Sequence, residues 1–287
     1  MSTDNLGFGC VSLTSYSFVK DAENILSTAF NGGIKHFDTA PLYGNGYSEK
    51  ILGKFIKDKR DKVTITTKCG LGNLHQPGIN INIALLVNSL KRKFRKEILS
   101  NSIEQPTPLN FRSIYLDYVQ RSLSNSLKNL QTDYIDYYFL HEALPVFLTD
   151  EALSFLINRK QEGVIRNLGI AAAYVNLLPL DHEAVKEFSI LQYENGPHYN
   201  THQLLLQFKD KNHFFHSTLK SLRYLKSPYS KSELAGILLN RACKINLSGK
   251  ILFSTIKQHS LINNLEAFEK YKNSSLEELN RIIDAIH

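Results

Sequence analysis

The chain has 287 residues, of which 43% are hydrophobic and 21% charged, so it can bury a large core and shows no sign of disorder. No apolar run is long enough to span a bilayer, and residues 1–10 lack the basic and apolar regions of a secretory signal. The three cysteines are too few and too scattered for a disulfide framework or a zinc site. These features predict a cytoplasmic protein without a bound metal.

The net charge of +7 raises the question of a nucleic-acid partner. Much of it comes from one basic run, LKRKFRKE, and no nucleic-acid recognition motif accompanies that run. We interpret the run as the solvated face of a surface helix, or alternatively as a basic rim that attracts an anionic cofactor or substrate. Neither nucleic acid nor a membrane is an expected partner.

Short β-branched and aromatic runs alternate with amphipathic stretches of helical length along the whole chain. Such runs pack well on a pleated surface and indicate strands. The predicted strands lie near 5–9, 34–38, 62–68, 134–140, 164–170, 188–193, 212–217 and 250–255. The predicted helices span 21–31, 48–57, 115–130, 150–161 and 259–270. Asp150 is the expected N-cap of the fourth helix.

Two regions interrupt this alternation. Residues 70–111 are too long for a simple strand-to-helix connection. We expect them to form an insertion over one end of the barrel that contributes to a substrate pocket. Residues 218–248, which contain SPYSKS, are expected to be irregular. Neither region is predicted to form a second domain.

Eight strands, each followed by a helix, favour an α/β fold, namely a closed (β/α)8 TIM-type barrel. We expect it to form a single domain over residues 1–287. The alternative is an open, doubly wound sheet. Its usual nucleotide-binding fingerprint, G-x-G-x-x-G, does not follow the first strand, which reads LGFGCVSL. The barrel predicts that functional residues lie at the C-terminal ends of the strands.

Four polar residues fall at such positions. Asp38 ends the second strand, Tyr43 lies in the loop after it, Lys68 ends the third strand and His141 follows the fourth. Neighbouring strands lie about 4.8 Å apart, so these side chains can meet. Each residue alone has an ordinary structural explanation as a turn residue, a packing aromatic, a surface lysine or a core histidine. Their joint occurrence at consecutive strand ends favours a catalytic group.

The chemistry of this group is that of proton transfer. A lysine ammonium about 4 Å from a tyrosine oxygen favours the phenolate by up to roughly 4 kcal/mol at an effective dielectric constant of about 20. We therefore expect Lys68 to lower the pKa of Tyr43, and burial to raise it and so offset part of that effect. Asp38 would keep Lys68 charged, and His141 would donate to a carbonyl oxygen. Tyr43 would act as general acid or base, and a cofactor would supply the hydride.

At these residues the chain resembles the aldo-keto reductase family. HFDTAPLYGNGYSEKILGKF carries that family's aspartate and tyrosine, TTK its lysine and YYFLHE its histidine. The resemblance covers residues 5–70 and 112–195 well and the C-terminal third weakly. The segment APLYGNGYSE and the long insertion resemble those of the family's sugar-oxidising branch. That branch includes D-threo-aldose and L-fucose dehydrogenases.

The resemblance implies a nicotinamide cofactor across the C-terminal face of the barrel. The residues it assigns to cofactor binding are Asp38, Gln192, His216, Ser254, Thr255 and Asn264. Several positions depart from the family's pattern. Ala171-Ala172 replaces a Ser-Asn pair that holds the nicotinamide amide, and His216 replaces a stacking aromatic. Ser254 and Ser260 replace a lysine and an arginine at the 2′-phosphate.

These departures bear on the choice of cofactor. Lys257 or His259 could compensate for the missing charges at the 2′-phosphate, since charge-assisted contacts are the strong ones. NADP is the family's default, and NAD remains the alternative.

Three functions are therefore considered for the chain. The first is an NAD(P)(H)-dependent oxidoreductase, an aldo-keto reductase or alcohol dehydrogenase that interconverts the carbonyl of an aldehyde, ketone or sugar and an alcohol. The second is an NAD-dependent aldose or lactol dehydrogenase. The third is a cofactor-binding regulatory protein with little turnover. The expected partner in the first two is a small-molecule carbonyl or sugar substrate.

Overall fold

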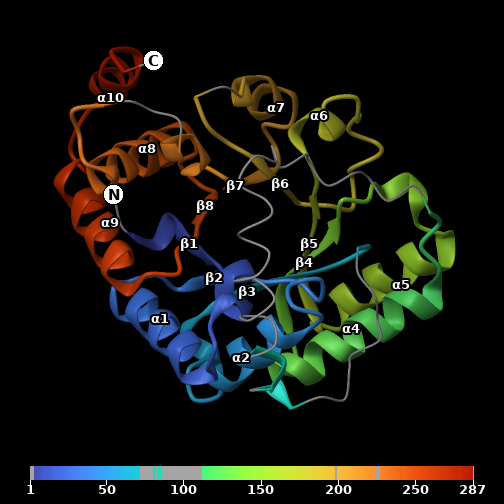
Figure 1. Ribbon diagram of the computed structural model, residues 1–287. Coiled ribbons are helices and arrows are strands. Elements are labelled where there is room, and N and C mark those ends of the chain that lie inside the picture. The colour runs from blue at the N-terminus through green and yellow to red at the C-terminus, as the bar shows by residue number, and fades with distance from the viewer. Residues whose placement is uncertain are drawn as a thin grey trace, which may run out of the picture.

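The computed structural model describes residues 3–71, 80, 81, 83–85, 112–197, 199–223 and 227–286. Eight parallel strands follow one another in sequence order around a closed barrel (Figure 1). The strands are β1 Leu6–Gly9, β2 His36–Asp38, β3 Thr64–Cys69, β4 Ile135–His141, β5 Ile165–Ala171, β6 Ile190–Glu194, β7 Asn212–His216 and β8 Lys250–Phe253. All eight coincide with predicted strands, and the fold is the predicted (β/α)8 TIM barrel.

Helices surround the barrel on its outside (Figure 1). They are α1 Val19–Asn31, α2 Tyr47–Ile56, α4 Leu116–Leu130, α5 Asp150–Gln161, α6 Tyr174–Leu177, α7 Thr201–Gln207, α8 Lys231–Ile245, α9 Gln258–Lys270 and α10 Leu276–Asp284. Short 3-10 helices are η1 Thr3–Asn5, η2 Cys10–Ser15, η3 Arg60–Lys62, η4 Pro145–Phe147 and η5 Lys220–Arg223. The five predicted helices are confirmed as α1, α2, α4, α5 and α9, with small shifts at their ends.

The predicted N-cap of α5 was wrong by one residue. Thr149, not Asp150, precedes the helix in extended backbone, and its hydroxyl accepts a hydrogen bond from the Ala152 amide. Only a residue outside the first helical turn can point its side chain back at the free amides. Asp150 is the first helical residue, where its negative charge still interacts favourably with the helix dipole.

The expectation that residues 218–248 are irregular was also wrong, because α8 fills about half of them. Ser230 and Glu233 form a capping box at its start, each side chain bonding to the other's backbone amide. Leu234, Ile237 and Leu238 are buried against α10 and its neighbours. The S-x-x-E pattern in the sequence is a known signal for a helix start, and it identifies this helix.

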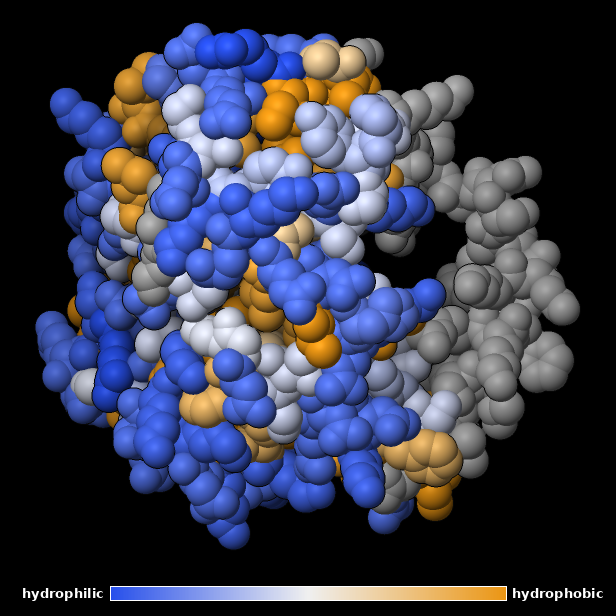
Figure 2. Space-filling view, turned by 90° about the vertical axis from the view of Figure 1, so that its left-hand side faces the viewer, coloured by the Kyte–Doolittle hydropathy of each residue, from blue (hydrophilic) through white to orange (hydrophobic). Residues whose placement is uncertain are grey.

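Most of the predicted insertion at 70–111, including the basic run, lies outside the described residues. Its role at the barrel's end stays a prediction. Over the described ranges, no helix is long and apolar enough to cross a membrane. On the side of the molecule where α1 and α9 lie, hydrophilic residues cover most of the face, and apolar side chains show in small groups (Figure 2).

The strand register decides which side chains point into the barrel. Parallel pairing matches Asp38 with Thr66, Lys68 with Phe139, and His141 with Ala171. Since side chains alternate along a strand, the inward residues form layers. The layer at the C-terminal end holds Asp38, Lys68, His141, Ala171, Gln192 and His216. Below it, aromatic rings such as Phe139 and Phe214, 5.7 Å apart, fill the interior. The aromatic layer is the floor of the site.

Candidate active site

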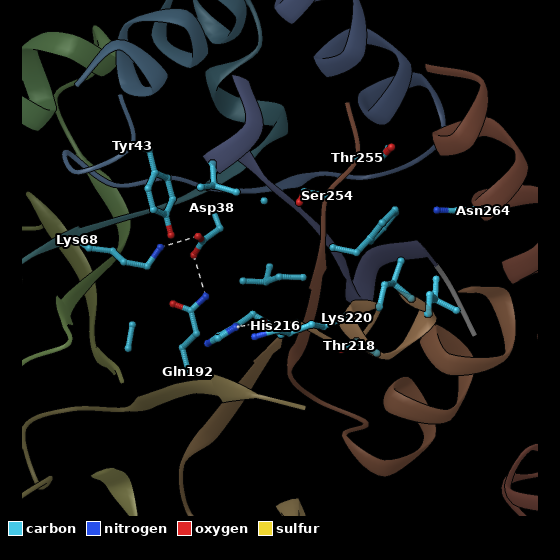
Figure 3. Close-up of a pocket in the computed structure, with 18 of the residues that line it drawn as sticks. Asp38, Tyr43, Lys68, Gln192, His216, Thr218, Lys220, Ser254, Thr255 and Asn264 are labelled. Carbon is cyan, nitrogen blue, oxygen red and sulfur yellow. Dashed lines mark hydrogen bonds and ion pairs between the residues drawn. The ribbon is translucent and has the colours of Figure 1, made fainter. Parts of the chain in front are cut away.

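A cavity of about 920 Å³ opens at the C-terminal ends of the strands. All nine residues that the sequence assigned to catalysis or cofactor binding line it: Asp38, Tyr43, Lys68, His141, Gln192, His216, Ser254, Thr255 and Asn264. Figure 3 shows Asp38, Tyr43 and Lys68 near one end of the cavity and Thr255 and Asn264 near the other. The barrel thus brings together residues that lie up to 226 positions apart (264 minus 38).

Asp38 and Lys68 form the centre of this group. The Lys68 ammonium donates to Asp38 Oδ1 over 2.5 Å and to the Thr39 carbonyl over 2.9 Å. Gln192 Nε2 donates to the second Asp38 oxygen over 3.0 Å (Figure 3). Burial acts to lower the pKa of Lys68, but the charge of Asp38 and the contact with Tyr43 outweigh it and raise that pKa. Lys68 therefore keeps its positive charge inside the protein.

Tyr43 lies between Lys68 and His141. The Lys68 nitrogen is 5.3 Å from the centre of the Tyr43 ring, and that ring meets the His141 ring edge to face at 5.9 Å. Burial raises the pKa of Tyr43, Lys68 lowers it, and Asp38 raises it again, with a net increase. Lys68 lowers this pKa as expected, but desolvation exceeds the effect of Lys68, which Asp38 also partly cancels. Tyr43 is therefore protonated at neutral pH.

The two histidines of the site are neutral. Burial and the charge of Lys68 hold the pKa of His141 well below its usual range, and burial also lowers that of His216. His216 Nδ1 bonds to the Ser217 hydroxyl over 2.9 Å. His141 Nδ1 is buried and has no hydrogen-bond partner among the described residues. His141 lines the cavity, and a histidine in such a position can hydrogen-bond to a ligand through a ring nitrogen.

Two other buried polar atoms on the cavity wall are unpaired in the described part of the chain. These are Gln192 Oε1 and Thr218 Oγ1, whose residues are 2% and 1% exposed. Because buried polar atoms are normally hydrogen-bonded, both atoms have the capacity to pair with a ligand or a water molecule in the cavity. The nicotinamide cofactor that the resemblance implies carries an amide and phosphates, which can pair with such atoms. The residues present are thus compatible with a nicotinamide cofactor.

Several lining residues were missed by the sequence reasoning. Two lysines, Lys220 of η5 and Lys231 of α8, line the cavity, whereas Lys257 and His259 are not among its described lining residues. The capping box of α8 could have indicated Lys231, because it fixes the start of that helix. No sequence signal indicated Lys220.

Glu142 was also missed. It follows His141 directly, lines the cavity and has a left-handed backbone with φ of 45°. Its Oε2 accepts a hydrogen bond from the Ala173 amide over 3.2 Å. Burial and the charge of Glu194 raise the pKa of Glu142, and the hydrogen bond from Ala173 lowers it. The net effect raises the pKa of Glu142 to about 7.

The fold places a buried Tyr-Lys-Asp group beside a histidine in a cavity at the C-terminal ends of the barrel strands. Residues 5–203 match the family model described as the aldo/keto reductase family. The chain belongs to the aldo-keto reductase family, as the sequence motifs predicted. Members of this family are NAD(P)-dependent oxidoreductases that act on carbonyl substrates.

Individual relatives support this assignment. The chain is 28% identical over 191 residues to the uncharacterized oxidoreductase YqkF of Bacillus subtilis, covering 67% of this chain and 51% of that protein. It is 29% identical over 176 residues to D-threo-aldose 1-dehydrogenase of a Pseudomonas species, covering 58% and 49%. The chain spans about half the length of the curated relatives it matches.

Solved structures share the whole fold. The aldo-keto reductase AKR11C1 from Bacillus halodurans, in its holo form, superposes with a TM-score of 0.68 at 23% identity, over 99% of this chain and 92% of that one. An aldo-keto reductase from Klebsiella pneumoniae in complex with NADPH gives a TM-score of 0.66 at 18% identity, over 98% and 90%. At these identities the likeness concerns the fold.

Proposed function

We propose that the protein is an NAD(P)(H)-dependent oxidoreductase that interconverts a carbonyl group of an aldehyde, ketone or sugar and an alcohol. The observation that carries this proposal is the buried ion pair of Lys68 and Asp38 beside a protonated Tyr43 on the cavity wall. A positioned acid next to a fixed positive charge is what carbonyl reduction requires.

In the reduction direction, Tyr43 donates its proton to the carbonyl oxygen. Its raised pKa keeps that proton available at neutral pH, and the charge of Lys68 stabilises the phenolate that remains. Asp38 holds Lys68 in place through the 2.5 Å contact. In the oxidation direction the ionised form of Tyr43, a small fraction at neutral pH, takes the proton of the alcohol. The charge of Lys68 favours this ionised form, so the same lysine charge assists both directions.

His141 has the role of orienting the substrate. Because its ring is neutral, one nitrogen carries a hydrogen and can donate to the carbonyl oxygen without adding a competing acid. When bound, the nicotinamide cofactor supplies or accepts the hydride. Gln192 Oε1 would accept a hydrogen bond from the nicotinamide amide, and His216 would lie against its ring.

We propose NADP(H) as the preferred cofactor. Ser254 and Ser260 lack charge, but Lys220 and Lys231 line the same cavity, and no ion pair engages either lysine in the described part of the chain. NADP(H) carries a 2′-phosphate in addition to the diphosphate that it shares with NAD(H). Phosphate oxygens make charge-assisted hydrogen bonds with lysines, so these two lysines favour the cofactor with the additional phosphate. The unpaired Thr218 hydroxyl adds a donor on the same wall.

A second candidate, an NAD-dependent aldose or lactol dehydrogenase, is favoured by the relative named D-threo-aldose 1-dehydrogenase. The same barrel and the same proton-transfer group would serve it. A regulatory protein with little turnover is disfavoured by the geometry, since every member of the proton-transfer group lines one cavity.

The test begins with cofactor binding. Because the chain has no tryptophan, the emission of NADPH or NADH can be followed on titration with little protein interference. Tyr43→Phe is expected to bind the cofactor normally and to reduce carbonyl compounds at least about 100-fold more slowly. Tyr47→Phe, the same change at a residue outside the cavity lining, is the control.

The outcomes of that experiment test the proposed function, the role of Tyr43 and the regulatory alternative separately. Failure to bind either reduced cofactor would overturn the proposal. Wild-type rates in Tyr43→Phe would remove Tyr43 from the mechanism. Binding without turnover over a broad panel of aldehydes, ketones and sugars would favour the regulatory alternative.

The cofactor preference has its own test. Lys220→Gln and Lys231→Gln should each weaken NADPH binding about tenfold and NADH binding less, because each removes a charged partner of phosphate. Lys257→Gln is the matched control. Equal affinities of the wild-type protein for NADPH and NADH would contradict the NADP proposal, and a larger effect of Lys257→Gln would reassign the phosphate contact.

A further inference from the structure

Glu142 is held firmly at the substrate end of the cavity although the proposed mechanism does not use it. Its amide donates to the Ala171 carbonyl over 2.7 Å, and its Oε2 accepts from the Ala173 amide. Between these two bonds its backbone has the left-handed conformation that glutamate rarely adopts. A strained residue that its surroundings hold on both sides is common at ligand sites.

A second carboxyl provides a comparison within the same structure. Glu194 Oε2 accepts from the Tyr174 amide over 2.7 Å, so Glu142 and Glu194 bind consecutive amides after β5. Only Glu142 of the two lines the cavity. Glu194 thus bonds to a backbone amide without lining the cavity. The bond from the Ala173 amide therefore does not by itself explain why Glu142 lines it.

The second oxygen of Glu142 remains available. Among the described residues, no hydrogen bond engages Oε1 and no ion pair engages the carboxyl, while Oε2 is taken by Ala173. A carboxyl beside a substrate can accept hydrogen bonds from hydroxyl or ammonium groups, and it repels carboxylates. Pressing an apolar group against it costs free energy, because the carboxyl loses solvent without gaining a partner.

The other charges of the cavity favour a neutral substrate. Lys68, Lys220 and Lys231 line it, against Asp38 and Glu142 on the acidic side. Lys220 and Lys231 are the proposed partners of the cofactor's phosphates, so they do not bear on the substrate. Lys68 stays charged at the substrate end, where its charge lowers the pKa of His141. It would repel an ammonium group in the same way, so a hydroxyl is the donor that fits. Since Glu142 and His141 are consecutive residues and both line the cavity, a hydroxyl bonded to Glu142 would lie at the same end of the cavity as the carbonyl that His141 orients.

We propose that Glu142 is a specificity-determining residue that accepts a hydrogen bond from a hydroxyl next to the reacting carbonyl. The substrates it selects are hydroxyaldehydes, hydroxyketones and sugars. This inference rests on the proposed oxidoreductase function.

The experiment compares glycolaldehyde with acetaldehyde, which differ by one hydroxyl. The ratio of their kcat/KM values is measured in the wild type, in Glu142→Gln, in Glu142→Asn and in Glu194→Gln. The assays are run at a pH of about 8.5, above the raised pKa of Glu142, so that the wild-type carboxyl is charged. Gln then keeps the shape and removes the charge. Asn tolerates the left-handed backbone and withdraws the acceptor, so the fold is retained. Glu194→Gln is the control outside the cavity lining.

The ratio is expected to fall about fivefold in Glu142→Gln and about tenfold or more in Glu142→Asn, with acetaldehyde turnover little changed. Glu194→Gln should keep the wild-type ratio. Glyoxylate provides a readout that structural damage cannot imitate, because Glu142→Gln should use it better than the wild type does.

An unchanged ratio in both Glu142 variants would overturn the inference, as would equal use of glyoxylate by Glu142→Gln and the wild type. A wild-type protein that binds NADPH but turns over neither aldehyde would instead count against the proposed function. The two failures are therefore distinguishable.

Discussion

Lys68 and Asp38 form an ion pair that is almost fully excluded from solvent, with Nζ 2.5 Å from Oδ1 and side-chain exposures of 2% and 5%. The second Asp38 oxygen is taken by Gln192, so the carboxylate has a partner on each side. A buried pair of this kind contributes little net stability, but breaking it leaves one charge without a partner. Removing one partner of a buried polar contact is therefore expected to cost far more stability than the intact contact contributes.

Lys68→Met is expected to lower the free energy of unfolding by about 3–5 kcal/mol, because it leaves the Asp38 charge buried and unpaired. Lys68→Met combined with Asp38→Asn should recover part of that loss, since no charge then remains. Urea unfolding followed by circular dichroism measures these two variants and Asp38→Asn alone. If the effects of the two single substitutions simply add in the double variant, the pair is not coupled.

Glu49→Gln should stabilise the protein increasingly as the pH rises from about 4 to neutral. The Glu49 carboxyl is fully buried, and burial raises its pKa more than the hydrogen bonds from Asn129 and Thr67 lower it. The folded protein then holds this proton more tightly than the unfolded chain, whose glutamates titrate near about 4.3, so ionisation costs stability. Urea unfolding at several pH values tests this. A difference between variant and wild type that does not change with pH would refute it.

Asp136→Ala is expected to destabilise the fold by about 3 kcal/mol and leave cofactor binding unchanged. Asp136, near the N-terminal end of β4, accepts from Arg60 over 2.7 Å, from Arg166 over 2.9 Å and from the Ile65 amide over 3.0 Å. Polar groups at this end of a barrel serve stability, whereas the opposite end serves function. The checks are urea unfolding and NADPH titration, and weakened NADPH binding by the folded variant would count against this assignment.

Ser254→Lys should strengthen NADPH binding about tenfold and leave NADH binding nearly unchanged, because it restores a cation where the resemblance places the 2′-phosphate. Ser254 lines the cavity at the end of β8. Ser248→Lys adds the same charge at an exposed position before β8 and should leave both affinities unchanged. Equal gains for the two cofactors would show that only the overall charge matters.

The sequence was sufficient to predict the barrel and the convergence of the site for one physical reason. In a parallel barrel every strand ends at the same rim, so once eight strands are recognised, residues at their ends must lie together. Asp38, Lys68, His141, Gln192 and His216 all follow from this rule.

Other features depend on distances that a linear pattern does not contain. The direction of the pKa shift of Tyr43 is a balance between burial and two opposite charges, and only the folded structure gives the depth of burial. Lys220 belongs to a short 3-10 helix with no sequence signal, and the left-handed backbone of Glu142 follows from its bonds across β5. These are contacts between segments distant in sequence.

The order of strands around the barrel separates two tasks between two arcs of the ring. Strands β2 to β4 and their loops supply Asp38, Tyr43, Lys68 and His141, while β6 to β8 supply Gln192, His216 and Ser254. If the proposed function holds, substitutions in the second arc would therefore alter which dinucleotide is bound without disturbing Tyr43, the proposed acid. The hydrogen bond from Gln192 to Asp38 joins the two arcs, so a substitution at Gln192 would disturb cofactor binding and the proton-transfer group together.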